Sequence, residues 1–138
     1  ELFHGLKIMS AGEKYTEQMG QYPVIALTLK SAKQSTFESA YYKLKEEIAE
    51  EFKRHEKQIL KSWLSEEDRE AYRNIVSGRA GYDDYSGALK FLSRILYEIY
   101  GKGVIILIDE YDVPLETSYF AGFYDEMAGF IRSLLESA

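Results

Sequence analysis

Two stretches of the chain are apolar almost without interruption, and each predicts a buried β-strand. The first covers residues 22–29 and has Pro23 at its start, where a strand tolerates proline. The second covers residues 103–108. Continuous apolarity, in place of alternation, is typical of strands that are covered on both faces, as in parallel sheets. Residues 2–14 are mixed and hold two glycines, which indicates a loop or the tail of an element that begins upstream.

Between these strands, apolar residues recur every three or four positions and predict several helices. The longest is expected to begin near residue 36, because Ser35 and Glu38 have the spacing of a capping box. The charged residues on its other face are most often just a solvated surface. Shorter helices are expected over residues 56–63, 66–76 (with Ser65 as N-cap) and 86–100 (ended by Gly101), with a turn or an exposed segment at residues 82–85.

A last helix is expected over residues 123–135. Pro114 is expected to end the segment that follows the second strand. The order strand, helical block, strand, helix predicts the α/β class with a parallel sheet. The helical block, residues 36–100, is longer than a plain crossover between neighbouring strands requires. We therefore interpret it as an insertion within a single domain that covers residues 1–138.

Composition narrows the classes of protein to consider. The net charge of -6 argues against a dedicated nucleic-acid surface, and the absence of cysteine excludes disulfides, cysteine zinc sites and thiol catalysis. The longest apolar run, residues 104–108, is far too short to span a membrane, so a cytoplasmic location is the default expectation. The chain begins at Glu1 without an initiator Met or a signal pattern, which suggests a segment of a longer protein.

The second strand runs directly into a cluster of acids, Asp109-Glu110-Tyr111-Asp112. Open parallel sheets place their ligands just beyond the carboxyl ends of their strands. Phosphoryl transfer to water needs one carboxylate to hold Mg²⁺ and a second to orient or deprotonate the water. We therefore interpret residues 103–112 as a Walker B strand and loop. The alternative is that Asp109 and Glu110 only cap the strand or pair with a basic side chain.

Residues 106–115 resemble the Walker B region of the bacterial AAA-ATPase-like family, whose members are often fused to a C-terminal PD-(D/E)XK nuclease-like domain. Three further stretches agree with that family in the same order: residues 2–8, 22–30 and 122–127. The resemblance implies a partial P-loop NTPase-like sheet in which residues 22–30 lie beside the Walker B strand. It also implies that Asp109 is the magnesium-associated acid and Glu110 the catalytic base. Asp112 belongs to the family pattern but receives no role.

Members of that family carry a glycine-rich phosphate loop upstream of the stretch at which this chain begins. No Gly-x-x-x-x-Gly-Lys-[Ser/Thr] motif occurs in residues 1–138. The Gly101-Lys102-Gly103 stretch is no substitute, because it precedes a strand instead of following one. We therefore expect an ATPase that uses ATP and Mg²⁺ in the intact protein. We expect residues 1–138 alone to bind neither cofactor and to be inactive.

Two further hypotheses remain. In the first, the helical block forms a non-enzymatic protein-interaction module. Alternatively, Asp83-Asp84 and Asp125-Glu126 could join Asp109 in the site of a metal-dependent phosphodiesterase. The two histidines, His4 and His55, lack the spacing of a zinc helix. Core packing explains Trp63 and the twelve tyrosines better than stacking on nucleic-acid bases does. A sheet of only two strands has exposed edges, so we also expect self-association.

Overall fold

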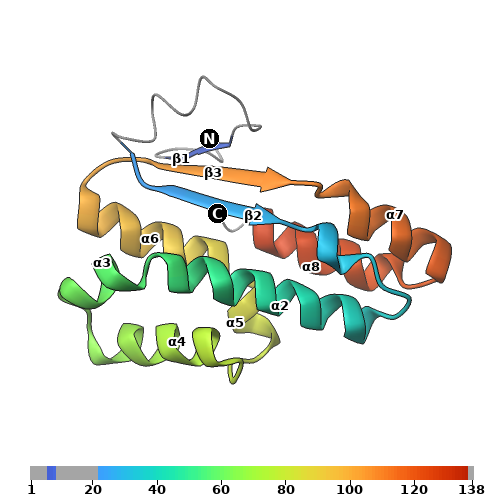
Figure 1. Cartoon of the computed structure of the whole chain (residues 1–138), viewed down its shortest axis with the longest axis horizontal. Helices are drawn as coiled ribbons and strands as arrows, with labels where there is room; N and C mark the ends of the chain where they lie inside the picture. The colour runs from blue at the N-terminus through green and yellow to red at the C-terminus, as the bar shows by residue number, and fades with distance from the viewer. Residues whose placement is uncertain (1–5, 9–21, 137–138) are drawn as a thin grey trace.

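The computed structural model describes residues 6–8 and 22–136, which form a parallel three-stranded sheet with helices packed against it (Figure 1). The strands are β1 (Leu6–Ile8), β2 (Val24–Thr28) and β3 (Val104–Asp109), in the order β1-β3-β2. Both predicted strands are confirmed, as is their parallel, side-by-side pairing. The α/β class is therefore correct.

The sheet has one strand more than the sequence pattern predicts. Leu6–Ile8 pairs with Val104, Ile105 and Ile106 of β3, so the expectation of a loop was wrong at these positions. A strand of three residues is too short to show the alternation of apolar and polar residues, or the apolar run, by which a strand is identified in a sequence. Only its hydrogen bonds to β3 define it.

The predicted helices occur in the predicted order, with small differences at their ends, and two further α-helices, α5 (Tyr82–Ser86) and α7 (Asp112–Ala121), were not predicted. The other helices of the described residues are η1 (Lys30–Ala32, a 3-10 turn), α2 (Phe37–Arg54), α3 (Glu56–Lys61), α4 (Glu66–Ser77), α6 (Ala88–Tyr100) and α8 (Tyr124–Glu136). Two predicted helix ends are confirmed: Ser65 accepts the backbone N–H of Asp68 at 3.1 Å, and Gly101 ends α6 with φ 68°. Glycine adopts this left-handed backbone without the steric cost of a Cβ.

Three local predictions were wrong. The N-cap of α2 is Thr36, whose Oγ1 accepts the Ser39 N–H at 3.1 Å, so Ser35 and Glu38 form no capping box. Residues 82–85 lie in the short helix α5 and not in a turn, although Tyr82, Asp83 and Asp84 are exposed, as the alternative expectation had it. Pro114 lies in the first turn of α7, which the sequence pattern did not predict. Proline is tolerated there because the first N–H groups of a helix have no partner within the helix.

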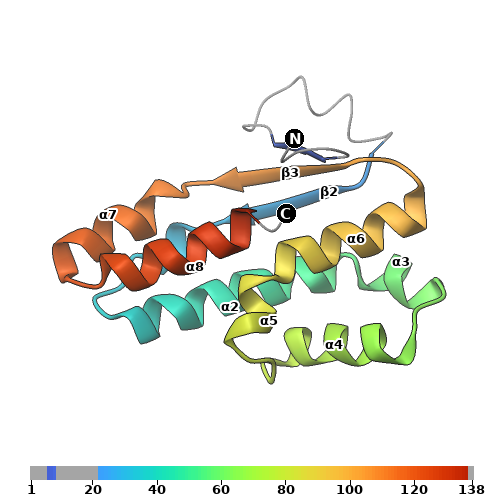
Figure 2. The same cartoon turned by 180° about the vertical axis from the view of Figure 1, so that it is seen from behind.

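The helices α2, α6 and α8 lie on the same side of the sheet, as both views of the chain show (Figure 1 and Figure 2). The main core joins the sheet face that carries Ile25 and Ile106 to buried side chains of these helices, such as Leu44 and Leu92. Met127, Phe130, Ile131 and Leu134 of α8 are buried as predicted. A second, small cluster consists of Val24, Ile105 and Leu107.

The aromatic residues divide between core and surface. Tyr72 and Tyr85 are fully buried, and their hydroxyls donate to the backbone carbonyls of Phe52 and Ile75, respectively. These bonds satisfy the polar end of each ring inside the core. Trp63 is 86% exposed, so the expectation of core packing was wrong for this residue. It was also wrong for seven tyrosines that are exposed: Tyr42, Tyr82, Tyr97, Tyr100, Tyr111, Tyr119 and Tyr124.

Candidate functional site

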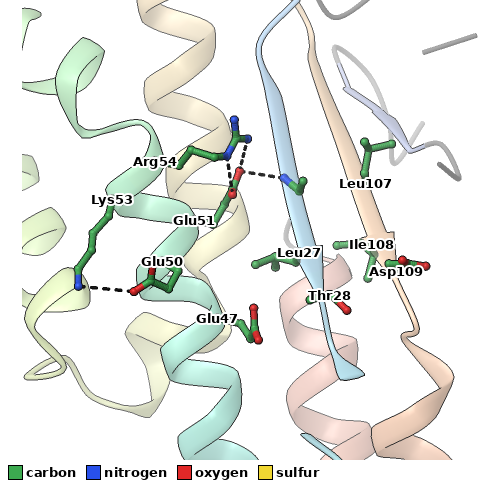
Figure 3. A pocket seen from close by; sticks show the side chains of 11 residues that line it. Leu27, Thr28, Glu47, Glu50, Glu51, Lys53, Arg54, Leu107, Ile108 and Asp109 are labelled. Carbon is green, nitrogen blue, oxygen red and sulfur yellow. Dashed lines mark hydrogen bonds and ion pairs between the residues drawn. The ribbon is translucent and has the colours of Figure 1, made fainter. Parts of the chain in front are cut away.

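The carboxyl end of β3 presents Asp109 to solvent next to the end of β2. Asp109 is the last residue of β3 and is the register partner of Thr28, the last residue of β2. The ladder continues one step further, because Leu29 donates its N–H to the Asp109 carbonyl at 3.0 Å. This bond holds the backbone of Asp109 in place while its side chain stays exposed. In Figure 3 the carboxylate points to the side of β3 that faces away from α2.

Glu110 is held in an unusual backbone conformation. Its φ of 55° is the only positive φ at a non-glycine residue within the described part of the chain. A side chain in this left-handed region costs about 1–2 kcal/mol relative to ordinary backbone, and such strain gathers at functional sites. The Glu110 carbonyl accepts the Val113 N–H at 3.2 Å, which fixes the turn from β3 into α7.

Neither carboxylate has a hydrogen bond or an ion pair with any residue of the described ranges, 6–8 and 22–136. Both residues are exposed. The simple alternative, in which Asp109 and Glu110 pair with a basic side chain, therefore finds no support in this part of the molecule. Both acids are available to a ligand.

A cavity of about 660 Å³ lies beside this strand end, between the sheet and α2 (Figure 3). Its walls come from β2, β3 and α2. The charged residues that line it are Glu47, Glu50, Glu51, Asp109, Lys53 and Arg54. The Asp109 carboxylate points away from α2, so the α2 side of the cavity holds three carboxylates and two cations, a net charge of -1.

One end of the cavity is closed by a hydrogen-bonded cluster that links α2 to the edge of β2. Glu51 accepts the Ala26 N–H at 2.9 Å and pairs with the Arg54 guanidinium through bonds of 2.6 and 2.9 Å. Arg54 in turn donates to the Val24 carbonyl at 2.7 Å. The Nε2 atom of His55 lies 3.0 Å from the same carboxylate. The cluster therefore fixes the position of α2 relative to the sheet.

The cluster also sets the protonation behaviour of Glu51, which is only 7% exposed. Burial by itself would raise the pKa of this carboxyl. The hydrogen bonds from His55, Arg54 and the Ala26 N–H outweigh burial and hold the pKa below its ordinary value. The charge pattern of this helix face predicted a solvated surface, which was wrong for Glu51. A usable signal was its position directly before Phe52, on the apolar stripe.

The remaining acids that the sequence singled out do not gather around Asp109. Asp83 and Asp84 lie in the first turn of α5, Asp125 and Glu126 in the first turn of α8, and Asp112 in the first turn of α7. Acids are favoured at these positions by the helix dipole. Across the described residues no group of three or more histidine or acidic side chains could hold a metal ion. His4 lies outside the described residues.

The comparisons with known proteins agree with the resemblance found in the sequence. The family model described as predicted AAA-ATPase matches residues 1–138. This chain belongs to the predicted AAA-ATPase family. Neither a curated protein nor a solved structure matches it. Among the helices described here, none is both long and apolar enough to cross a membrane.

Proposed function

We propose that this member of the predicted AAA-ATPase family supplies the magnesium-and-water arm, or Walker B element, of an ATPase site with a P-loop fold. The observation that carries the proposal is the left-handed backbone of Glu110. It directly follows the end of the central strand of a parallel sheet, which is where such sheets bind their ligands. Strain at this position has no evident packing purpose, because Glu110 is exposed.

In the proposed reaction each acid has its own role. Asp109 would hold Mg²⁺ through a coordinated water, and the metal would offset the charge of the phosphates. Glu110 would accept a proton from the water that attacks the terminal phosphate. The Leu29 N–H would keep the Asp109 backbone in place during the reaction.

The phosphates of ATP need a further element. The sequence of residues 1–138 holds no glycine-rich phosphate loop, so we propose that residues outside this range supply one in the intact protein. Residues 1–138 alone would then lack ATPase activity. The family resemblance extends the proposal to a bacterial, cytoplasmic protein with a nuclease-like domain beyond the ATPase.

The test uses a chain in which residues 1–138 follow a phosphate loop that ends in Gly-Lys-Thr. This protein is expected to hydrolyse ATP with Mg²⁺. Glu110→Gln should lower the rate at least about 100-fold and keep ATP binding, because only the proton acceptor is lost. Asp109→Asn should raise the Mg²⁺ concentration needed for half the maximal rate. The control is Glu116→Gln, a change at an exposed acid of α7 that should leave the rate unaltered. An unaltered rate in Glu110→Gln would overturn the assignment of the base.

A second candidate function is a protein-interaction module built on the helical block. It is favoured by the exposure of Trp63, at 86%, and of Leu60, at 43%, near the end of α3. Large exposed apolar side chains are enriched where proteins bind one another. Loss of partner binding in Trp63→Ala, at an unaltered ATPase rate, would favour this candidate as an additional role.

A further inference from the structure

The outer edge of β2 is the strand edge that faces away from β3. The Ile105 N–H donates to the Pro23 carbonyl at 2.9 Å, and the Leu29 N–H donates to Asp109. Because the backbone groups of successive residues point to opposite sides of a strand, Val24, Ala26 and Thr28 direct theirs outward. Such an edge is a template for another strand unless something covers it.

The first half of this edge is covered by side chains of α2. Arg54 donates to the Val24 carbonyl and Glu51 accepts the Ala26 N–H, so the ion pair takes the place of a neighbouring strand. The second half is open. The Ala26 carbonyl and the Thr28 N–H have no hydrogen-bond partner in the described part of the chain, and both residues are exposed.

The open half of the edge lies in the cavity that α2 shares with the sheet (Figure 3). Ala26 and Thr28 line it on the side of the sheet, and Glu47 and Glu50 line it on the side of α2. A volume of about 660 Å³ is large enough for several peptide-sized groups. The cavity therefore combines unpaired main-chain groups with acidic side chains.

The charges of the lining favour a cation. Arg54 is committed to Glu51 and to a backbone carbonyl. Lys53 lies 3.7 Å from Glu50, but both side chains are at least half exposed, so this pair is weak. Among the residues that the structure describes, Glu47 accepts only the neutral Ser31 hydroxyl, at 3.1 Å. Two carboxylates on one helix face are thus left largely uncompensated.

We propose that the open half of the β2 edge binds a short, extended and basic peptide segment by strand addition. A peptide N–H would donate to the Ala26 carbonyl, and the Thr28 N–H would donate to a peptide carbonyl. A Lys or Arg side chain of the peptide would lie against Glu47 and Glu50. Main-chain bonds give such complexes affinity, and the side-chain pockets give them specificity. Because Glu51 occupies the Ala26 N–H, the bound stretch is limited to a few residues.

This binding goes beyond the proposed ATPase function, since it requires neither phosphate nor Mg²⁺. The test titrates residues 1–138 into a fluorescently labelled peptide of alternating lysine and valine and follows the anisotropy. The peptide should bind. A peptide of alternating glutamate and valine should not bind, because its charge repeats that of the cavity. A lysine–valine peptide methylated at its backbone nitrogens should also fail to bind, because it cannot donate to the Ala26 carbonyl.

The protein variants separate the cavity from general charge attraction. The double change Glu47→Gln and Glu50→Gln should weaken binding by roughly tenfold, which corresponds to the loss of two partly exposed ion pairs. The matched control changes Glu66 and Glu67 of α4 to Gln, which alters the net charge equally at residues that do not line the cavity, and should leave binding unchanged. Slower hydrogen exchange at the Thr28 amide in the complex would locate the peptide on the edge.

Three results would overturn the proposal: no binding of the lysine–valine peptide, equal binding of the methylated peptide, or equal weakening by both double variants. Glu110→Gln should leave peptide binding intact, because Glu110 does not line the cavity. Failure of the peptide experiment would therefore leave the ATPase proposal standing. Failure of the ATPase experiment would likewise leave the peptide site standing.

Discussion

The Glu51 carboxylate accepts the backbone N–H of Ala26 at 2.9 Å, across 25 positions of the chain. This bond places a buried acid of the longest helix on the edge of a strand. The Arg54 guanidinium holds the same carboxylate and also reaches the strand. The cluster therefore stabilises the packing of the helical block on the sheet and closes one end of the cavity beside Asp109.

Glu51→Ala should lower the free energy of unfolding by about 2 kcal/mol, because it leaves the Ala26 N–H and the Arg54 guanidinium without their acceptor. Urea unfolding followed by circular dichroism measures the change. The matched control is Glu50→Ala, whose side chain is 73% exposed and should contribute less than about 0.5 kcal/mol. Equal effects of the two changes would contradict the role of the cluster.

The contribution of Glu51 should depend on pH. Its pKa in the folded protein lies below the ordinary value of 4.5, so the folded state favours the charged form. The stabilisation is therefore fully present above that value and is lost as the pH falls through the folded-state pKa. The difference in unfolding free energy between the natural chain and Glu51→Gln should be largest at neutral pH and should shrink below about pH 4.5. A difference that stays constant down to pH 3 would argue against the lowered pKa.

Replacements of Glu110 should show that its left-handed backbone lowers the stability of the protein. Glycine adopts a φ of 55° without the cost that a Cβ carries, so Glu110→Gly should be more stable than Glu110→Ala by about 1 kcal/mol. Both variants lack the carboxylate and should be equally inactive in the ATPase assay. Chemical denaturation of the two proteins measures the difference. Equal stabilities would show that the turn relaxes and carries no strain.

Self-association of residues 1–138 stays a prediction, although its original premise of a two-stranded sheet was wrong. Pairing of strand edges, or an exchange of elements between two chains, would join them. Light scattering at increasing concentration should show a rising mass, and Trp63→Ala should leave that rise unaltered. A constant monomer mass would contradict the prediction. A rise that disappears in Trp63→Ala would indicate association through the exposed tryptophan instead.

The amino-acid sequence by itself determined the elements whose pattern is local. Long apolar runs specified β2 and β3, because strands buried in parallel sheets need few polar positions. Helical spacing specified the larger helices, and Ser65 and Gly101 marked two of their ends through bonds and angles that involve only near neighbours. The acids Asp109 and Glu110 could be found because they follow an apolar strand directly.

The tertiary structure alone decided the features that depend on partners distant in sequence. β1 exists as a strand only through its pairing with β3, since three residues carry no periodicity of their own. Glu51 and Arg54 look like surface charges until β2 lies against them, because a helical pattern does not say which strand edge its side chains reach. The left-handed backbone of Glu110 also became visible only in the structure, for a different reason. The chain turns there from β3 into α7, and glutamate has no intrinsic preference for this conformation that would reveal the turn in the sequence.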